Sequence, residues 1–77
     1  METVTFLFTG RFETASFADF ARHRAARLAL SAEMPDLRPS RIRITVSGEP
    51  DLVDAFEMAC SLGPIDCLVA DVVRRPG

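Results

Sequence analysis

Two segments of this chain alternate regularly between apolar and polar residues, over residues 3–9 and again over residues 41–47. Strict alternation is typical of a strand that buries one face and exposes the other, because successive side chains of a strand point to opposite sides. Since two such strands need a common apolar layer, the pattern predicts a sheet with one face packed in a core. The apolar positions of the two strands are Val4, Phe6, Phe8, Ile42, Ile44 and Val46.

Each of these strands is followed by a segment with the apolar spacing of an amphipathic helix. Ser16, with Asp19 three residues later, has the pattern of an N-cap with a capping box and predicts a helix to about Leu30. Pro50 suits the first turn of a second helix, and the Gly-Pro pair at 63–64 is a stop signal. The apolar stripes of the two helices comprise Phe17, Phe20, Ala21, Ala25, Leu28, Leu52, Val53, Phe56, Ala59 and Cys60.

The remaining segments are a weakly patterned stretch and an apolar C-terminal one. Within residues 31–40, Met34 fits a short strand, whereas Pro35 and Pro39 favour turns. Residues 65–73 are apolar on both faces and predict a final strand. Such a strand is either central in the sheet or has one face covered by a dimer contact, and the sequence leaves both arrangements open.

The predicted order is strand, helix, strand, strand, helix, strand. This order most simply forms an α+β fold of the ferredoxin-like type, βαββαβ, with a four-stranded antiparallel sheet and both helices on one face. The 77 residues leave room for one core, so the sequence predicts a single domain over residues 1–77.

Composition argues against several classes of function. The net charge of −2 and strands without outward rings disfavour nucleic acid as a partner, although arginines cluster around residues 38–43 and 74–75. No apolar run reaches the ~20 residues of a membrane span, and the acidic N-terminus lacks a signal-peptide pattern, so a cytoplasmic location is expected. Cys60 and Cys67 lie on apolar stripes and are expected to be buried, reduced thiols. With His23 as the single histidine, neither a metal nor a cofactor is expected.

The stretch from Gly10 to Ala18 joins the first strand to the first helix. It reads Gly-Arg-Phe-Glu-Thr-Ala-Ser-Phe-Ala and resembles the phosphate loop of the acylphosphatase family, roughly Gly-Arg-Val-Gln-Gly-Val-x-Phe-Arg. The glycine, Arg11 and Phe17 match, and the likeness continues diffusely along nearly the whole chain. A loop at a helix N-terminus can hold an anion with its backbone N–H groups. The resemblance therefore marks a candidate anion loop, which comprises Arg11, Phe12, Glu13, Thr14, Ala15, Ser16 and Phe17.

The resemblance also implies which catalytic groups are missing. In the family, an arginine at the end of the loop holds the phosphate and an asparagine orients the attacking water. Ala18 stands at the arginine position, and the asparagine position holds Asp36 in an ungapped register or Glu33 in a shifted one. Loss of one such donor typically costs ~10²–10³ in rate. Glu13 and Thr14, in place of a glutamine and a glycine, further oppose an anion.

Two hypotheses follow from the resemblance. The first is an acylphosphatase-like domain that has lost acyl phosphate hydrolysis and binds a small anion or a protein partner, as a monomer or a homodimer. The alternative is an acylphosphatase whose phosphate is held by a relocated arginine, which would be Arg11, Arg22 or Arg38. A regulatory domain that dimerises through its sheet edges and an RNA-binding sheet are less favoured.

Overall fold

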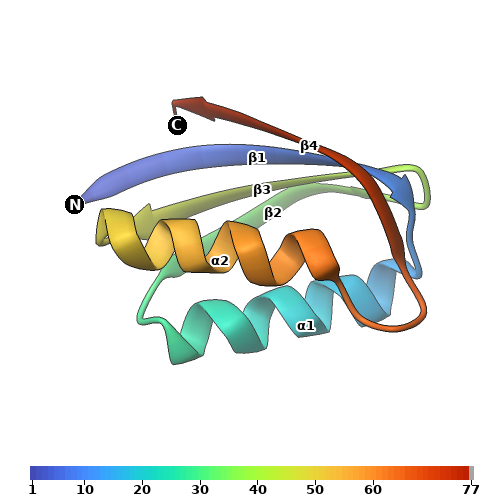
Figure 1. The fold of residues 1–77 in the computed structure, drawn as a ribbon, viewed down its shortest axis with the longest axis horizontal. Helices are drawn as coiled ribbons and strands as arrows, with labels where there is room; N and C mark the ends of the chain where they lie inside the picture. Colours follow the sequence, from blue (N-terminus) through green and yellow to red (C-terminus); the bar gives the residue numbers. More distant parts are fainter. Residues whose placement is uncertain (77) are drawn as a thin grey trace.

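The computed structural model describes residues 1–76 and has six elements in the predicted order. The elements are β1 (Glu2–Arg11), α1 (Thr14–Arg27), β2 (Ser31–Arg38), β3 (Arg41–Gly48), α2 (Pro50–Leu62) and β4 (Leu68–Pro76). The four strands form one antiparallel sheet in the order β2-β3-β1-β4, and Figure 1 shows both helices on one face of it. The predicted α+β, ferredoxin-like βαββαβ arrangement is confirmed.

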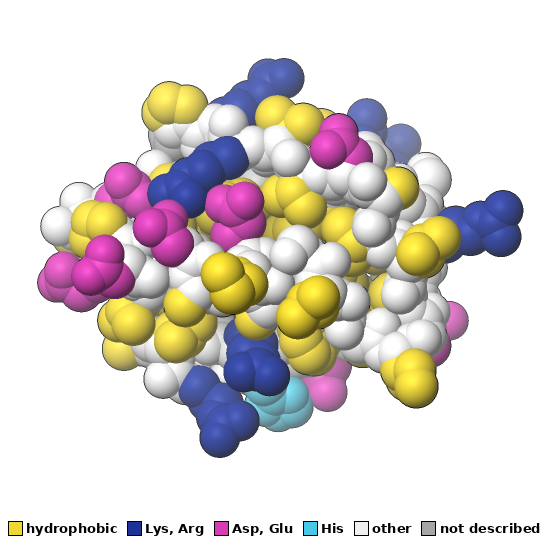
Figure 2. Space-filling view, in the orientation of Figure 1, with side chains coloured by type: hydrophobic (Ala, Val, Ile, Leu, Met, Phe, Trp, Pro, Cys, Tyr) yellow, Lys and Arg dark blue, Asp and Glu magenta, His cyan; other side chains and the backbone are white. Residues whose placement is uncertain are grey.

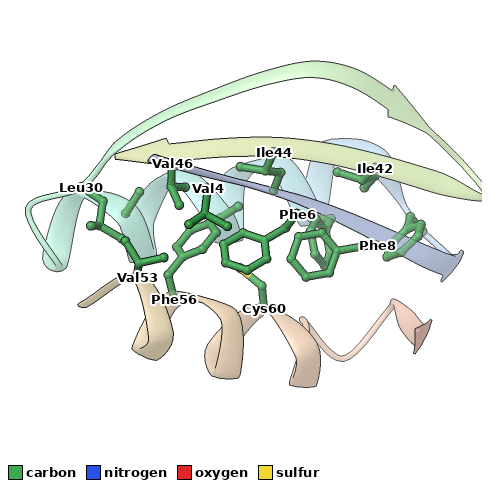
Figure 3. Close-up of a cluster of buried hydrophobic side chains, with 14 residues drawn as sticks. Val4, Phe6, Phe8, Leu30, Ile42, Ile44, Val46, Val53, Phe56 and Cys60 are labelled. Atoms are coloured by element: carbon green, nitrogen blue, oxygen red, sulfur yellow. The ribbon is translucent and has the colours of Figure 1, made fainter. Parts of the chain in front are cut away.

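The core lies between the sheet and the two helices (Figure 3). Phe6 and Phe8 of β1 are fully buried, which confirms that they point inward. Phe17, near the start of α1, packs against Phe8 with ring centroids 5.4 Å apart and against Phe12 at 5.0 Å. Aromatic pairs at these separations add to the stability that burial supplies. The rings therefore hold the beginning of α1 over the end of β1.

The final strand is an edge strand, and it begins later than predicted. β4 starts at Leu68 because residues 64–67 form a turn, in which the Cys67 amide donates to the Pro64 carbonyl at 3.1 Å. β4 pairs with β1 on one side, and no other strand within residues 1–76 pairs with it, so the option of a central strand is wrong. Gly63 ends α2 with a φ of 67°, a conformation that favours glycine.

The segment with the weakest pattern forms the other edge strand, β2. The turn expected at Pro35 is wrong: Pro35 lies inside β2, where the register with β3 shifts between Glu33 and Asp36. A proline is tolerated there because an edge strand has one side without ladder hydrogen bonds. The turn at Pro39 is confirmed, in the short connection between β2 and β3.

Helix α1 differs from its prediction at both ends. It begins at Thr14 with Glu13 in the N-cap position, so the prediction of Ser16 as the N-cap is wrong. It ends at Arg27, earlier than predicted, and Ala29 has a φ of 54°, which an α-helix does not accommodate. Within residues 1–76, neither helix is long and apolar enough to cross a membrane.

Candidate functional site

The junction between β1 and α1 is short, because Phe12 and Glu13 alone connect the two elements. The Gly10 amide donates to the Ser40 carbonyl at 3.2 Å, and the Phe12 amide donates to the Pro39 carbonyl at 2.8 Å. These two bonds hold the junction against the turn between β2 and β3. Both amides are therefore already engaged and are not free to bind an anion.

The second half of the candidate anion loop, residues 14–17, is the first turn of α1. The Phe17 amide donates to the Glu13 carbonyl at 2.9 Å, as expected inside a helix. The amides of residues 14–16 precede the first helical bond and carry the partial positive charge of a helix N-terminus. An anion bound at this junction would therefore have to meet the first turn of α1 rather than an extended loop.

An acidic side chain of the chain itself lies at this first turn. The Ser16 hydroxyl donates to Oδ1 of Asp66 at 2.8 Å. Asp66 belongs to the turn between α2 and β4, which folds back beside the beginning of α1 (Figure 1). This bond explains in physical terms why Ser16 does not cap the helix, since its hydroxyl is used elsewhere. A carboxylate at this end of a helix is also stabilised by the helix dipole.

A hollow lies beside this contact, and we refer to it as the junction hollow. Its lining residues are Arg11, Phe12, Glu13, Ile65, Asp66, Cys67 and Leu68. Arg11 is the one cation among them, against the two carboxylates of Glu13 and Asp66. The local charge therefore disfavours an incoming anion.

The Cys67 thiol lies in the junction hollow and is half-buried rather than fully buried. Its Sγ is 3.7 Å from the Glu13 carbonyl oxygen and 3.7 Å from Oδ1 of Asp66. Burial raises the pKa of the Cys67 thiol, so the protonated form dominates at neutral pH. Because the thiolate is the nucleophilic form, Cys67 has none of the activation of a catalytic cysteine.

Ala18, at the position of the family arginine, lies in α1 with 3% of its surface exposed. Its methyl group offers neither a hydrogen-bond donor nor a charge. A longer basic side chain at this buried position would have to displace its neighbours or reach around them to solvent.

Asp36, at the position of the family asparagine, lies on the opposite side of the sheet from the helices. It pairs across the strands with Arg43, which alternates with the buried Ile42, and paired residues share a face. Its carboxylate accepts hydrogen bonds from Nε of Arg38 at 2.9 Å and from Nη2 of Arg41 at 3.2 Å. The hydrogen bond from Arg38 is the main cause that lowers the pKa of Asp36.

The shifted register gives the same result for the asparagine position. Glu33 pairs with Thr45, which shares the helix-free face with Arg43. The structure therefore does not bring Ala18 together with either acidic residue.

The three arginines considered as relocated phosphate ligands have different surroundings. Arg11 lines the junction hollow. Arg38 is bound to Asp36 on the helix-free face of the sheet. Arg22 is exposed on α1, about 12 Å along the helix axis from Thr14. Arg11 alone lies beside the first turn of α1.

Two solved structures superpose on this arrangement of strands and helices. An acylphosphatase from Bacillus subtilis superposes with a TM-score of 0.90 and 19% identity, and the match covers 100% of this chain and 86% of that one. The chain has the acylphosphatase fold. An acylphosphatase from Coxiella burnetii gives a TM-score of 0.88 and 18% identity, and the match covers 99% of this chain and 80% of that one. No protein-family model and no curated protein matches the sequence.

Asp66 is the residue of this site that sequence reasoning missed. The predicted strand over residues 65–73 includes Asp66, whereas the structure has it in the turn that starts at Pro64. A signal was present, because proline and aspartate close together are typical of a turn. The contact with Ser16 joins two residues that are 50 positions apart in the sequence, and no local pattern encodes it.

Proposed function

We propose that this chain is a domain of the acylphosphatase fold that does not hydrolyse acyl phosphates and acts by binding. The observation that carries the proposal is the position of the Asp66 carboxylate, which accepts a hydrogen bond from the Ser16 hydroxyl at the first turn of α1. This negative group lies where a substrate phosphate would have to approach. Because both cysteines are free, a reducing compartment such as the cytoplasm suits the domain.

The chemistry of acyl phosphate hydrolysis explains why this arrangement opposes it. The phosphoryl group needs preorganised donors, and the attacking water needs a polar group that orients it. Here the Gly10 and Phe12 amides are bound to carbonyls, Ala18 offers no donor, and Asp36 is held by arginines on the far face of the sheet. Glu13 and Asp66 add repulsion toward a phosphate dianion. The site therefore lacks the Gly10 and Phe12 amides and an arginine at position 18 as phosphate donors, and Asp36 does not lie beside it to orient the attacking water.

Hydrolysis of benzoyl phosphate tests the proposal directly. We expect benzoate release with the wild-type chain to equal release without protein, because no group holds the phosphate. The same rate is expected for Arg11→Ala and for the control Arg22→Ala, with circular dichroism used to confirm that all three chains are folded. Protein-dependent turnover by the wild-type chain would contradict the proposal.

Hydrolysis with Arg11 as the phosphate ligand is a second candidate, because Arg11 lines the junction hollow beside the first turn of α1. It makes a different prediction in the same assay: turnover in the wild type that Arg11→Ala abolishes and Arg22→Ala preserves. Inorganic phosphate would then inhibit competitively.

Neutralising Asp66 is expected to uncover weak anion binding at the first turn of α1. Asp66→Asn keeps an oxygen that can accept the Ser16 hydroxyl but removes the negative charge. We expect affinity for inorganic phosphate to rise roughly five- to tenfold, as a surface charge of this kind repels a dianion. Titration followed by NMR shifts of the amides of residues 14–16 measures the change.

The control for this experiment is Asp19→Asn, which removes an exposed carboxylate that faces His23 on α1. It is expected to leave phosphate affinity within about twofold of the wild type. Equal affinities in Asp66→Asn and the wild type would show that Asp66 does not keep anions away.

A further inference from the structure

Within residues 1–76, no strand pairs with the outer side of β4, so this sheet edge is open to pairing. The other sheet edge, β2, carries Pro35 and a shift of register, both of which hinder pairing with another strand. β4 has its irregularity at Ala70, where its register with β1 changes, and it is regular from Asp71 to Arg75. A segment of five regular residues is therefore available on this edge.

Arg74, one of the two arginines of this segment, extends over the helix-bearing face of the sheet toward α2. Its Nη1 donates to Asp54 at 2.7 Å and to Glu57 at 3.1 Å, and its Nη2 donates to Glu2 at 2.9 Å. The guanidinium lies 5.6 Å from the centroid of the Phe6 ring. Figure 2 shows acidic side chains gathered beside a basic one over the start of α2. A positive charge on an edge strand usually prevents pairing, and here that charge is neutralised within the chain.

The outward side chains of the same segment form a self-complementary row. Asp71, Val73 and Arg75 pair with Thr9, Leu7 and Thr5 of β1, so all three lie on the helix-free face. Within residues 1–76, no ion pair engages Asp71 or Arg75. Along the strand, the three side chains are therefore negative at Asp71, apolar at Val73 and positive at Arg75.

We propose that β4 pairs in antiparallel fashion with β4 of a second copy of this chain, about a two-fold axis at Val73. In this register Asp71 of each copy lies opposite Arg75 of the other, and the two Val73 side chains meet at the centre. Directly opposed residues of opposite charge stabilise an antiparallel pair. The two sheets become one eight-stranded sheet with all helices on one face, and an isologous interface closes at a dimer.

The charges also select this register over its neighbours. If all helices are to stay on one face of the joined sheet, the two-fold axis must pass through a residue of β4 and not between two residues. Side chains alternate between the faces, so an axis between two residues would place a residue of the helix-bearing face opposite one of the helix-free face. With the axis at Val72, Asp71 lies opposite Val73, and with the axis at Arg74, Val73 lies opposite Arg75. Only the axis at Val73 joins opposite charges twice.

The expected association is weak, because the paired segment is short and association carries a large entropy cost. We expect a dissociation constant on the order of 100 µM. The inference concerns β4 and goes beyond the proposed function, since it holds whether or not the chain hydrolyses acyl phosphates.

Sedimentation equilibrium of the full chain between about 10 µM and 1 mM tests the proposal. The mass is expected to rise from that of the 8.5 kDa monomer toward twice that value. Asp71→Arg and Arg75→Asp are each expected to weaken the dimer at least tenfold, because each places like charges opposite one another. Glu33→Arg on β2 is the matched control and is expected to dimerise as the wild type does.

Mixing the two weakened variants is the decisive step. An Asp71→Arg chain paired with an Arg75→Asp chain restores two opposite-charge pairs, so the equimolar mixture is expected to form a heterodimer with near wild-type affinity. The double variant is expected to dimerise with itself for the same reason. Since only folded chains can re-form the pair, these two samples separate misfolding from lost charge complementarity.

Three outcomes would overturn the proposal. The first is a wild-type chain that stays monomeric up to 1 mM. The second is a dimer that the two charge reversals do not weaken. The third is single variants that fail both to recombine and to dimerise as the double variant while circular dichroism shows them folded.

Discussion

Gly10→Ala is expected to destabilise the protein by about 3–5 kcal/mol, more than any surface substitution. Gly10 has a φ of 155°, a conformation that L side chains rarely adopt. A Cβ here would collide with the backbone carbonyl oxygen of Leu68 and lie 2.9 Å from the Ala70 amide nitrogen. Because both atoms belong to the backbone of β4, relief requires the strand to move away from β1. The register change between the two strands lies at this same point.

Urea unfolding followed by far-UV circular dichroism measures this loss, since the chain has no tryptophan or tyrosine for fluorescence. Gly48→Ala is the matched control, because the Cβ there meets the end of the Leu30 side chain, which can rotate. We expect that substitution to cost about 1–2 kcal/mol. Equal losses in the two variants would contradict the account of Gly10.

Alkaline pH is expected to destabilise the protein through Cys60. Burial raises the pKa of this thiol to about 12, from an ordinary value near 9. Between these values the unfolded chain releases the proton and the folded chain keeps it, so stability is intact below pH 9 and falls as pH rises toward 12. The loss is about 2 kcal/mol by pH 10.5. Cys67, whose pKa is also raised, acts in the same direction.

The amino-acid composition leaves few other groups that could contribute to this pH dependence. All nine basic residues are arginine and tyrosine is absent, so no lysine or tyrosine side chain adds to the pH dependence that the cysteines produce in this range. Free energies of unfolding at pH 8, 9.5 and 10.5, measured with a phosphine reductant, give the slope. Cys60→Ala is expected to lose about 1–2 kcal/mol at pH 7 but to flatten the slope, whereas Cys67→Ala keeps most of it. A slope that Cys60→Ala leaves unchanged would contradict the assignment.

The sheet and its core were predictable because their signals are local and periodic. Phe6 and Ile44 alternate with polar neighbours, and the structure buries both completely. Phe56 lies on a helical stripe and is likewise buried. Burial of these residues follows from one requirement, the removal of apolar surface from water. The apolar residues that meet it recur with the period of the strand or helix, so the sequence pattern reveals them.

The ends of elements and the site were less predictable because they depend on contacts between distant segments. Ser16 has the local pattern of an N-cap, but its hydroxyl donates a hydrogen bond to Asp66 and α1 starts at Thr14. Pro35 reads as a turn residue, yet the sheet edge accommodates it. The apolar residues of β4 leave open a central strand or a face covered by a dimer contact, because periodicity reports burial of a face and not the presence of a neighbouring strand.

The central position of β1 in the sheet has a consequence for how the chain folds. β1 acquires one neighbour, β3, from the middle of the chain and the other, β4, from its last described residues, where Pro76 pairs with Val4. Pairing of β1 with β4 closes a loop of nearly the whole chain, and this costs conformational entropy before the contacts between the two strands stabilise the pair. We therefore expect folding to be slower than for a helical protein of equal length. Until β4 docks, β1 itself is an exposed edge beside the phenylalanine cluster. Docking of β4 therefore also ends the period in which β1 of a partly folded chain can pair with another chain.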